Sequence, residues 1–325
     1  MVKLKEIAGK LGFGVSTVSA VLNGKDYCYV SVEKKKLIKD TAEAMGYIPN
    51  RMSRGMKGLP TQTIGIIGWL FAVPVLSRLM DCLNMELSNM GYTVLLGDSR
   101  YKDQKLIVNE FLSRGIDGLL VNSVFKRQDL ESLLHRDPVP YVVVNQEYDG
   151  LSVTLDRRKG AFDALEHMIL EHGRRRPVFV CNNLQSNNEK FEGFKAAAGK
   201  YKLESSYVET PNLLNDMKKS ADKVISLNSD AVLASNDVVA GMLIRHLKDA
   251  GLRVPEDISV IGFDGIEYIC LMSSPMLTSV LHPVDKVAKK AVELLMAQIN
   301  GVEVATEVHY IKPLLKIGGS CGCII

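Results

Sequence analysis

VKLKEIAGKLGFGVSTVSAVLNG, residues 2–24, is the stretch that decides the fold of the N-terminal part of the chain. Its first half predicts an amphipathic helix, because four apolar residues recur on one helical face: Leu4, Ile7, Ala8 and Leu11. A glycine-bearing turn, residues 12–14, ends this helix, and a second short helix is predicted from Ser16 to Leu22. Two short helices joined by a tight turn indicate a helix-turn-helix unit.

The outer face of the second helix carries only short side chains. We expect these positions to be exposed: Val15, Ser16, Thr17, Ser19 and Ala20. Such a helix can lie deep in the major groove of DNA, where hydroxyls and backbone amides of its first turn reach base edges and phosphates. An ordinary helical hairpin with hydroxyl caps fits the same spacing, so the pattern alone leaves both interpretations open.

Positive charge is concentrated in the same part of the chain. Residues 1–60 contain eleven of the 40 lysines and arginines but only five of the 37 acidic residues. Such an asymmetry is typical of proteins that bind a polyanion. A third helix is predicted from its N-cap Ser31 to near Gly46. Its run Lys34-Lys35-Lys36 fits phosphate binding and a solvated face equally well.

Residues 47–58, YIPNRMSRGMKG, are interpreted as a linker. The segment has three basic residues and two glycines but too little apolar surface to fold alone, so we expect it to become ordered on a partner. If it becomes helical on DNA, Met56 is placed as an apolar wedge for a minor-groove step, with Arg54 and Lys57 beside it.

Taken together and in this order, the motifs resemble the lactose-repressor/galactose-repressor (LacI/GalR) family of bacterial transcription regulators. The resemblance rests on residues 2–24, on GYIPNRMSRGMK (46–57) and on TIGII (63–67), and it extends through nearly all of the chain. It implies a homodimer whose two headpieces bind a near-palindromic DNA operator and bend it with two hinge helices. The family usually has leucine where this chain has Met56.

The expected DNA contacts divide into two kinds. Short side chains of the second helix, Ser16, Thr17 and Ala20 above all, are expected to set specificity, whereas basic residues contact phosphate or the minor groove. The complete set of expected DNA-binding residues is Lys5, Val15, Ser16, Thr17, Ser19, Ala20, Asn23, Lys25, Arg51, Ser53, Arg54, Met56 and Lys57.

Beyond Pro60 short apolar runs alternate with amphipathic helices. The runs predict two sets of buried parallel strands: 63–68, 93–96, 118–121 and 141–144, then 178–181, 231–234, 259–263 and 277–280. Two doubly wound sheets indicate an α/β body of two lobes with ligands at the carboxyl ends of the strands. Periodicity alone does not separate this fold from two consecutive Rossmann-like domains. The resemblance implies the periplasmic-binding-protein-like fold, in which the chain crosses between lobes more than once.

The predicted organisation has three parts. A helix-turn-helix headpiece covers residues 1–48, a hinge covers 49–60, and an effector-binding and dimerisation domain covers 61–325. The resemblance places the helix 284–299 back in the first lobe and the end of the chain in the second. The implied lobes are about 61–154 with 283–310, and about 155–282 with 311–325.

Polar residues at the carboxyl ends of strands are candidates for binding a small-molecule effector. Asp264 closes one strand and matches the ligand-contacting aspartate of the family. Asn236 and Asp237 follow another strand, where N-capping of the next helix is the alternative role. The complete set of expected effector-binding residues is Trp69, Phe71, Val75, Asn145, Asp156, Lys190, Asn236, Asp237 and Asp264.

Two departures from the family bear on the effector. Relatives commonly have arginine where this chain has Lys190, and lysine lacks the planar fork that binds vicinal hydroxyls or a carboxylate in bidentate fashion. Residues 68–76 are almost wholly apolar where the family often has a polar turn, at a loop that normally faces the cleft. Sugar is the family default, and a less polar metabolite, or no effector, follows closely.

Catalytic and metal motifs are missing from the sequence. No phosphate-binding GxGxxG or GxxxxGK[ST], no GxSxG and no HExxH is found, so we expect no enzyme and no cofactor. The six histidines lack metal-ligand spacing and are interpreted as helix-end, surface or packing residues: His135, His167, His172, His246, His282 and His309. Cys321-Gly322-Cys323 could bind metal or sense redox state, but without a second ligand pair we interpret all six cysteines as reduced thiols.

The predicted dimer face is the helix 74–90 of the first lobe, whose long apolar stripe is widened by Met85 and Met90. The charged amphipathic N-terminus and the lack of a long apolar run predict a soluble cytoplasmic protein. Two rival functions remain open. One is an α/β enzyme acting on a sugar or nucleotide, with a basic tether. The other is a DNA-bound regulator that responds to a protein partner.

Overall fold

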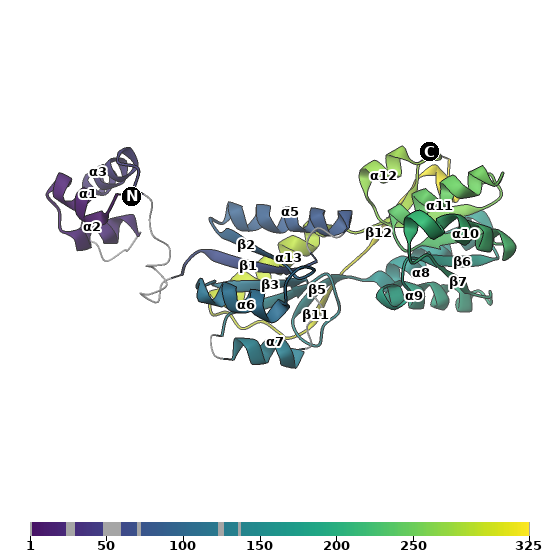
Figure 1. Cartoon of the computed structure of the whole chain (residues 1–325), viewed down its shortest axis with the longest axis horizontal. Helices are drawn as coiled ribbons and strands as arrows, with labels where there is room; N and C mark the ends of the chain where they lie inside the picture. The colour runs from purple at the N-terminus through teal and green to yellow at the C-terminus, as the bar shows by residue number, and fades with distance from the viewer. Residues whose placement is uncertain are drawn as a thin grey trace. The chain divides into compact units, whose positions relative to one another are not determined.

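The computed structural model describes residues 2–23, 30–47, 60–69, 73–122, 127–135 and 138–324. The chain divides into two compact units, Met1–Thr61 and Gln62–Ile325 (Figure 1). We describe each unit by itself.

The first unit is a small bundle of helices around its own apolar core. Its helices are α1 (Leu4–Leu11), α2 (Val15–Leu22) and α3 (Val32–Ala44). Gly12 ends α1 in the left-handed conformation, with φ of 69°, and Ser31 caps α3 by accepting a hydrogen bond from the Lys34 amide. The predicted helix-turn-helix is therefore confirmed. The core is formed by Ile7, Ala8, Val18, Val21, Ile38 and Ala42.

The second unit contains two lobes, each built on a six-stranded sheet. The first sheet is parallel throughout and has the strand order β11-β5-β4-β3-β1-β2. Its strands are β1 (Thr63–Gly68), β2 (Thr93–Asp98), β3 (Gly118–Asn122), β4 (Tyr141–Val144), β5 (Ser152–Leu155) and β11 (Val308–Ile311).

The second sheet has the order β12-β10-β9-β8-β6-β7 and is parallel except for the antiparallel pair of β10 and β12. Its strands are β6 (Pro177–Cys181), β7 (Ser206–Glu209), β8 (Ala231–Ala234), β9 (Ser259–Asp264), β10 (Thr278–Leu281) and β12 (Leu314–Lys316). Helices on both faces of both sheets make each lobe a doubly wound α/β layer structure, as predicted.

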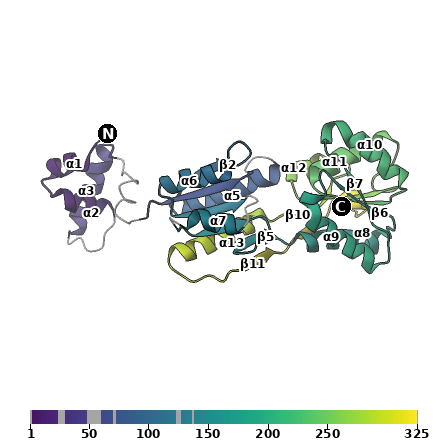
Figure 2. The same ribbon diagram turned by 60° about the horizontal axis from the view of Figure 1, so that its bottom comes forward.

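Helices cover both faces of each sheet (Figure 2). They bury apolar side chains against the strands. In lobe one, α5 (Pro74–Asn89) and α13 (Val284–Ile299) pack on one face, and α6 (Gln104–Ser113) and α7 (Arg127–Leu134) on the other. In lobe two, α10 (Leu213–Ser226) and α11 (Asp237–Asp249) oppose α8 (Arg157–His172) and α9 (Asn188–Lys200). The remaining helical segments are η1 (Gln185–Asn187), α12 (Glu267–Met272) and η2 (Gly319–Cys321). Among the described helices, none is long and apolar enough to cross a membrane.

The chain passes between the lobes three times. It leaves sheet one after β5 and enters α8, returns from β10 into α13, and crosses again between β11 and β12. These crossings exclude two consecutive Rossmann-like domains and produce the periplasmic-binding-protein-like topology. They also bring the carboxyl ends of strands from both lobes to one cleft.

Four strands were missed, and the burial of one was predicted wrongly. β5, β7, β11 and β12 have three or four residues and mix polar with apolar side chains, whereas the equally short β4 and β8 are continuous apolar runs. β2 was expected to be buried, but it is an edge strand whose Leu96 is 50% exposed. An apolar run indicates a strand without indicating its place in the sheet.

Candidate functional site

The exposed face of α2 is the candidate nucleic-acid interface of the first unit. Val15 is 44% exposed, Ser16 is exposed, and Thr17 and Ser19 are half-buried. Lys5 is exposed on α1. Gly14 is the N-cap residue of α2 and makes no side-chain cap, so no capping side chain covers the start of this helix.

Two further predicted positions lie at the end of α2, and one of them differs from expectation. Ala20 was expected to be exposed, and this was wrong, because only 9% of it is accessible. A single methyl group stands little above the helix backbone, so larger neighbours shield it. Asn23 closes the helix: its Nδ2 donates to the Ser19 carbonyl at 2.7 Å and lies 3.3 Å from Ser19 Oγ. Seven other predicted site residues lie outside the described residues: Lys25, Arg51, Ser53, Arg54, Met56, Lys57 and Phe71.

A cavity of about 540 Å³ between the two lobes is the candidate small-molecule site. Six of the predicted effector residues line it: Val75, Asn145, Lys190, Asn236, Asp237 and Asp264. Lobe one contributes an apolar wall, residues 73–76, and lobe two contributes a polar wall built by the loops after β6, β8 and β9. The structure thus brings these six residues together at the carboxyl ends of the strands.

Trp69 and Asp156 do not line this cavity. Trp69 is 55% exposed, directly after β1. Asp156 instead caps α8, accepting a hydrogen bond from the Lys159 amide at 2.8 Å, and lines a separate depression beside Tyr310. The residue of the crossing from β5 to α8 that lines the cleft is the neighbouring Arg157.

The cavity also contains polar residues that the sequence did not single out: Arg157, Asn182, Ser186, Asn187 and His282. Arg157 follows β5, one of the strands that were missed, and His282 directly follows β10. The place of His282 after a predicted strand was an available signal, whereas Arg157 gave none because its strand was not predicted. His282 had instead been interpreted as a helix-end, surface or packing residue.

Lys190, in the first turn of α9, is the most unusual cation of the cleft. The residue is 8% exposed, and its Nζ donates to the Ser235 carbonyl at 2.6 Å. Nζ lies 3.8 Å from Asp264 Oδ1 and 4.1 Å from the ring centroid of Phe263. Burial lowers the pKa of the Lys190 amine, and the carboxylate of Asp264 opposes that effect. The amine is thus held in place by groups of lobe two.

Asp237, at the start of α11, is fully buried beside this lysine. Its Oδ1 accepts from Ser279 Oγ at 2.5 Å, and its Oδ2 accepts from the Ile266 amide at 2.6 Å. Burial raises the pKa of Asp237 to about 7, although both hydrogen bonds oppose the shift. Capping of α11 is performed by Asn236, whose Oδ1 accepts from the Val239 amide at 2.9 Å while the residue lines the cleft. The capping and pocket roles therefore coexist in Asn236.

Two non-glycine residues of the cleft have left-handed backbone conformations. Asn145 has φ of 64° at the end of β4, and Asp264 has φ of 100° at the end of β9. Such conformations are unfavourable for residues other than glycine. Asp264 lies further from the left-handed helical region than Asn145 does. Both occur where a strand ends at the cleft, one in each lobe.

Arg157 lies at the first crossing and links the lobes. Its Nη2 donates to the carbonyl oxygen and to Oδ1 of Asn145, each at 2.6 Å, on the lobe-one side. Its Nη1 lies 3.3 Å from Glu189 Oε2 on α9 of lobe two. A change in lobe closure that moves Asn145 relative to Glu189 must therefore change at least one of these contacts.

His282 lies at the second crossing. Its ring is buried, and within the described part of the chain Nε2 has no hydrogen-bond partner. Burial holds the pKa of His282 well below its usual value, and Arg157 and Lys190 add to that effect. The ring of His282 is thus neutral in the folded protein, and the residue lines the cleft.

A helix-turn-helix unit joined to a two-lobed, cleft-bearing body defines a DNA-binding transcriptional regulator. Residues 3–50 match the family described as bacterial regulatory proteins, lacI family, and residues 166–321 match the periplasmic binding protein-like domain. These two matches give the chain the domain architecture of LacI-family regulators.

Relatives span almost the whole chain. Catabolite control protein A of Priestia megaterium is 28% identical, with 92% of this chain and 93% of the relative covered. The transcriptional repressor PurR of Vibrio vulnificus is 27% identical, with 98% of each covered. Among solved structures, the Lac repressor dimer bound to operator and an anti-inducer has a TM-score of 0.87 at 20% identity, covering 98% of this chain and 99% of that one. The CelR–cellobiose complex has a TM-score of 0.69 at 25% identity, covering 98% and 100%.

Proposed function

We propose that this protein is a homodimeric repressor whose affinity for a near-palindromic operator is set by a polyhydroxylated effector in the inter-lobe cleft. The headpiece 1–48 would bind DNA, the hinge 49–60 would connect it, and 61–325 would sense the effector. The observation that carries the proposal is the cleft with a wall of buried, fixed polar groups from lobe two facing an apolar wall from lobe one.

The chemistry of the cleft supports a neutral ligand with many hydroxyls. The cations Lys190 and Arg157 are balanced nearby by Asp264 and Glu189, so no excess charge selects an ionic ligand. Amides, a hydroxyl and a neutral imidazole supply further donors and acceptors. A cavity of about 540 Å³ has room for a monosaccharide or a disaccharide. The CelR structure contains cellobiose, and another similar structure contains ribose, which adds weight to a sugar.

Control of DNA binding would follow from the crossings. A ligand that contacts both walls binds the closed arrangement of the lobes more tightly than the open one, and so shifts the population toward it. Arg157 and His282 lie at two of the three crossings and line the cleft, so they are placed to respond to the ligand.

The operator is tested by selecting bound DNA from a random duplex pool with the full-length protein at near-physiological salt. We expect one near-palindrome. Recovery of no consensus would contradict sequence-specific operator binding and favour the alternative of an α/β enzyme with a basic tether. Turnover of sugars or nucleotides would then test that alternative.

The effector is tested by thermal unfolding with cellobiose, ribose and xylulose, beside nucleobases and apolar amino acids. A sugar at about 100 times its Kd stabilises the folded protein by about 2.7 kcal/mol, and we expect Lys190→Met to abolish that shift. The same sugar should change operator affinity measured by fluorescence anisotropy. If only an apolar compound raises the melting temperature, the effector is apolar and not a sugar. If none of the compounds raises it, a protein partner is favoured as the signal.

A further inference from the structure

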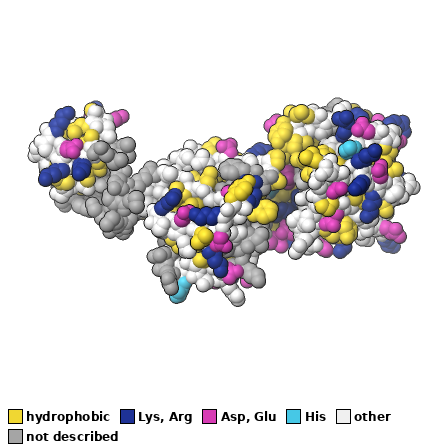
Figure 3. All heavy atoms as spheres, viewed as in Figure 1, with side chains coloured by type: hydrophobic (Ala, Val, Ile, Leu, Met, Phe, Trp, Pro, Cys, Tyr) yellow, Lys and Arg dark blue, Asp and Glu magenta, His cyan; other side chains and the backbone are white. Residues whose placement is uncertain are grey.

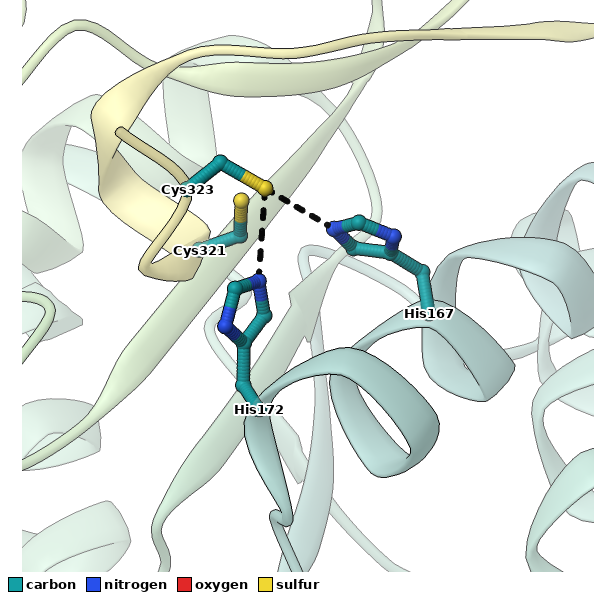
Figure 4. A group of neighbouring side chains, drawn as sticks. All are labelled: His167, His172, Cys321 and Cys323. Carbon is teal, nitrogen blue, oxygen red and sulfur yellow. Dashed lines mark hydrogen bonds between the residues drawn. The ribbon is translucent and has the colours of Figure 1, made fainter. Parts of the chain in front are cut away.

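Four side chains with metal-ligating atoms meet in lobe two, and none of them lines the cleft. His167 and His172 lie near the end of α8, Cys321 ends η2, and Cys323 follows two residues later. Figure 4 shows the two imidazoles on the helix pointing toward the two thiols of the C-terminal tail. One ligand atom from each of the four residues lies within 4.8 Å of all the others.

The distances suit a tetrahedral ion. Cys323 Sγ lies 3.5 Å from His167 Nε2 and 3.4 Å from His172 Nε2. With zinc–sulfur bonds of about 2.3 Å and zinc–nitrogen bonds of about 2.0–2.1 Å, neighbouring atoms of a tetrahedral shell lie about 3.3–3.8 Å apart. Cys323 is therefore already at the required spacing from both rings, and modest contraction would complete the shell.

The donor set selects the metal. Two thiolates with two imidazoles form a closed set typical of structural zinc, whereas magnesium and calcium prefer oxygen donors. Cys321 is buried and the other three residues are half-buried, so an ion can enter and yet be largely shielded afterwards.

The surroundings hold the first cysteine in place. The buried Thr278 hydroxyl accepts a hydrogen bond from the Gly318 amide at 2.9 Å. Its single hydrogen can be donated either to the Gly318 carbonyl at 2.8 Å or to Cys321 Sγ at 3.1 Å, and a thiolate would favour the second arrangement. Ser259 Oγ donates to the Cys321 carbonyl at 2.6 Å. Hydrogen bonds of this kind, made to the ligating residues, orient the metal ligands and are needed for full metal affinity.

Gly322 allows the tail to pass close to the histidines. Its φ is +115°, and a Cβ at this position would lie 2.9 Å from His172 Nδ1. Both the backbone conformation and the lack of space require glycine between the two cysteines.

We propose that His167, His172, Cys321 and Cys323 bind one zinc ion, which fastens the C-terminal tail to α8. The ligands are brought together by two of the three lobe crossings, because α8 follows the first and the tail follows the third. Since the ion binds only the folded arrangement, it stabilises lobe two. This site is independent of the effector and of DNA.

The test uses untagged, full-length, reduced protein. Elemental analysis should find about one zinc per chain, lost on treatment with a strong chelator. Refilling with cobalt should produce visible ligand-field absorption together with near-ultraviolet thiolate-to-cobalt charge transfer. The melting temperature should fall on chelation and recover with added zinc.

Variants locate the ligands. Cys323→Ser and His167→Gln should each lose the zinc and the response of the melting temperature to chelator, whereas Cys82→Ser in lobe one and the exposed His135→Gln should keep both. Thr278→Val should keep the site but weaken zinc affinity about tenfold or more.

Three results would overturn the proposal. They are folded, reduced wild-type protein without zinc and without cobalt charge transfer, a Cys323→Ser variant that holds zinc as wild type does, and preferential retention of copper or iron. Each can be obtained whether or not an operator or effector has been found, so failure here is distinguishable from failure of the regulator function.

Discussion

Asp237 is the buried carboxyl in the cleft whose protonation couples to folding. Its pKa is about 7 in the folded protein, because burial disfavours the charge, against an ordinary value of 3.8. Between these values the folded state holds a proton that the unfolded chain has lost. The stabilising contribution is therefore complete below about pH 4 and is lost as the pH rises to about 7.

We expect Asp237→Asn to remove this pH dependence. The amide keeps an oxygen for the Ile266 amide, and the Ser279 hydroxyl can turn to accept from its nitrogen. Relative to the variant, the wild type should lose up to about 1.4 kcal/mol of unfolding free energy per pH unit between pH 5 and 7. Urea unfolding at several pH values measures this, and parallel curves for the two proteins would refute it.

Lys5 and Ser16 are expected to play separable roles in the headpiece. Lys5→Ala removes an exposed charge, so affinity should fall equally for operator and random DNA, with the salt slope reduced by about one. Ser16→Ala should instead lower the ratio of operator to random affinity. Anisotropy titrations over a salt series check both, and a change of specificity in Lys5→Ala would show that the lysine contacts bases.

At the scale of elements, the close approach of α8 and α9 positions Lys190. Gly193 lies against the backbone of α8, since a Cβ at this residue would lie 2.0 Å from the Arg158 carbonyl oxygen. Gly193→Ala must push the two helices apart, at a cost of about 1–3 kcal/mol, and should also weaken effector binding because α9 carries Lys190.

Gly199 provides the matched control on the same helix. A Cβ there meets nothing within 4 Å, so Gly199→Ala should leave stability unchanged or raise it by about 0.5 kcal/mol. Chemical unfolding compares the two variants. Equal stability of both would mean that the helix contact tolerates a methyl group.

The elements themselves were predictable to different degrees. The helices 4–11 and 284–299 and the strands 141–144 and 231–234 occur with the predicted bounds, because their apolar spacing is long or is bounded by turn residues. The four missed strands carry no continuous apolar run, so only pairing with strands distant in the sequence stabilises them.

At the scale of the whole molecule, the proposed dimer requires an apolar face. The stripe of α5 is mostly core, with Leu79, Leu83 and Leu87 buried, while Met85 and Met90 are 52% and 49% exposed. In lobe two, α12 lies on the same side of the molecule and exposes Tyr268, Leu271 and Met272 (Figure 1). Hydrophobic side chains gather over this part of lobe two (Figure 3).

We expect Met85→Asp and Met272→Asp each to weaken dimerisation at least about tenfold, because a carboxylate would be desolvated in an apolar interface. Leu170→Asp, on the exposed side of α8, is the control and should leave the dimer intact. Sedimentation velocity over a concentration series measures the effect. A dimer unaffected by both methionine substitutions would place the interface elsewhere.

The sequence by itself determined the class of the protein. Local spacing predicted the two short helices and an α/β body, and the resemblance of the ordered motifs to a known family separated these from a helical hairpin and from consecutive Rossmann-like domains. The position of Asp264, Asn236 and Asp237 after strands placed them at one cleft. These inferences succeed because helical faces, turns and parallel strand ends follow from residues close together in the chain.

Only the tertiary structure decided which distant residues meet. It turned Asp156 to its helix, placed Arg157 and His282 in the cleft, and joined Cys321 and Cys323 to two histidines of α8. No metal-ligand spacing in the sequence predicts this cluster, because its residues come from segments about 150 residues apart. Crossings between lobes set such contacts, and a crossing depends on the packing of whole sheets rather than on any local pattern.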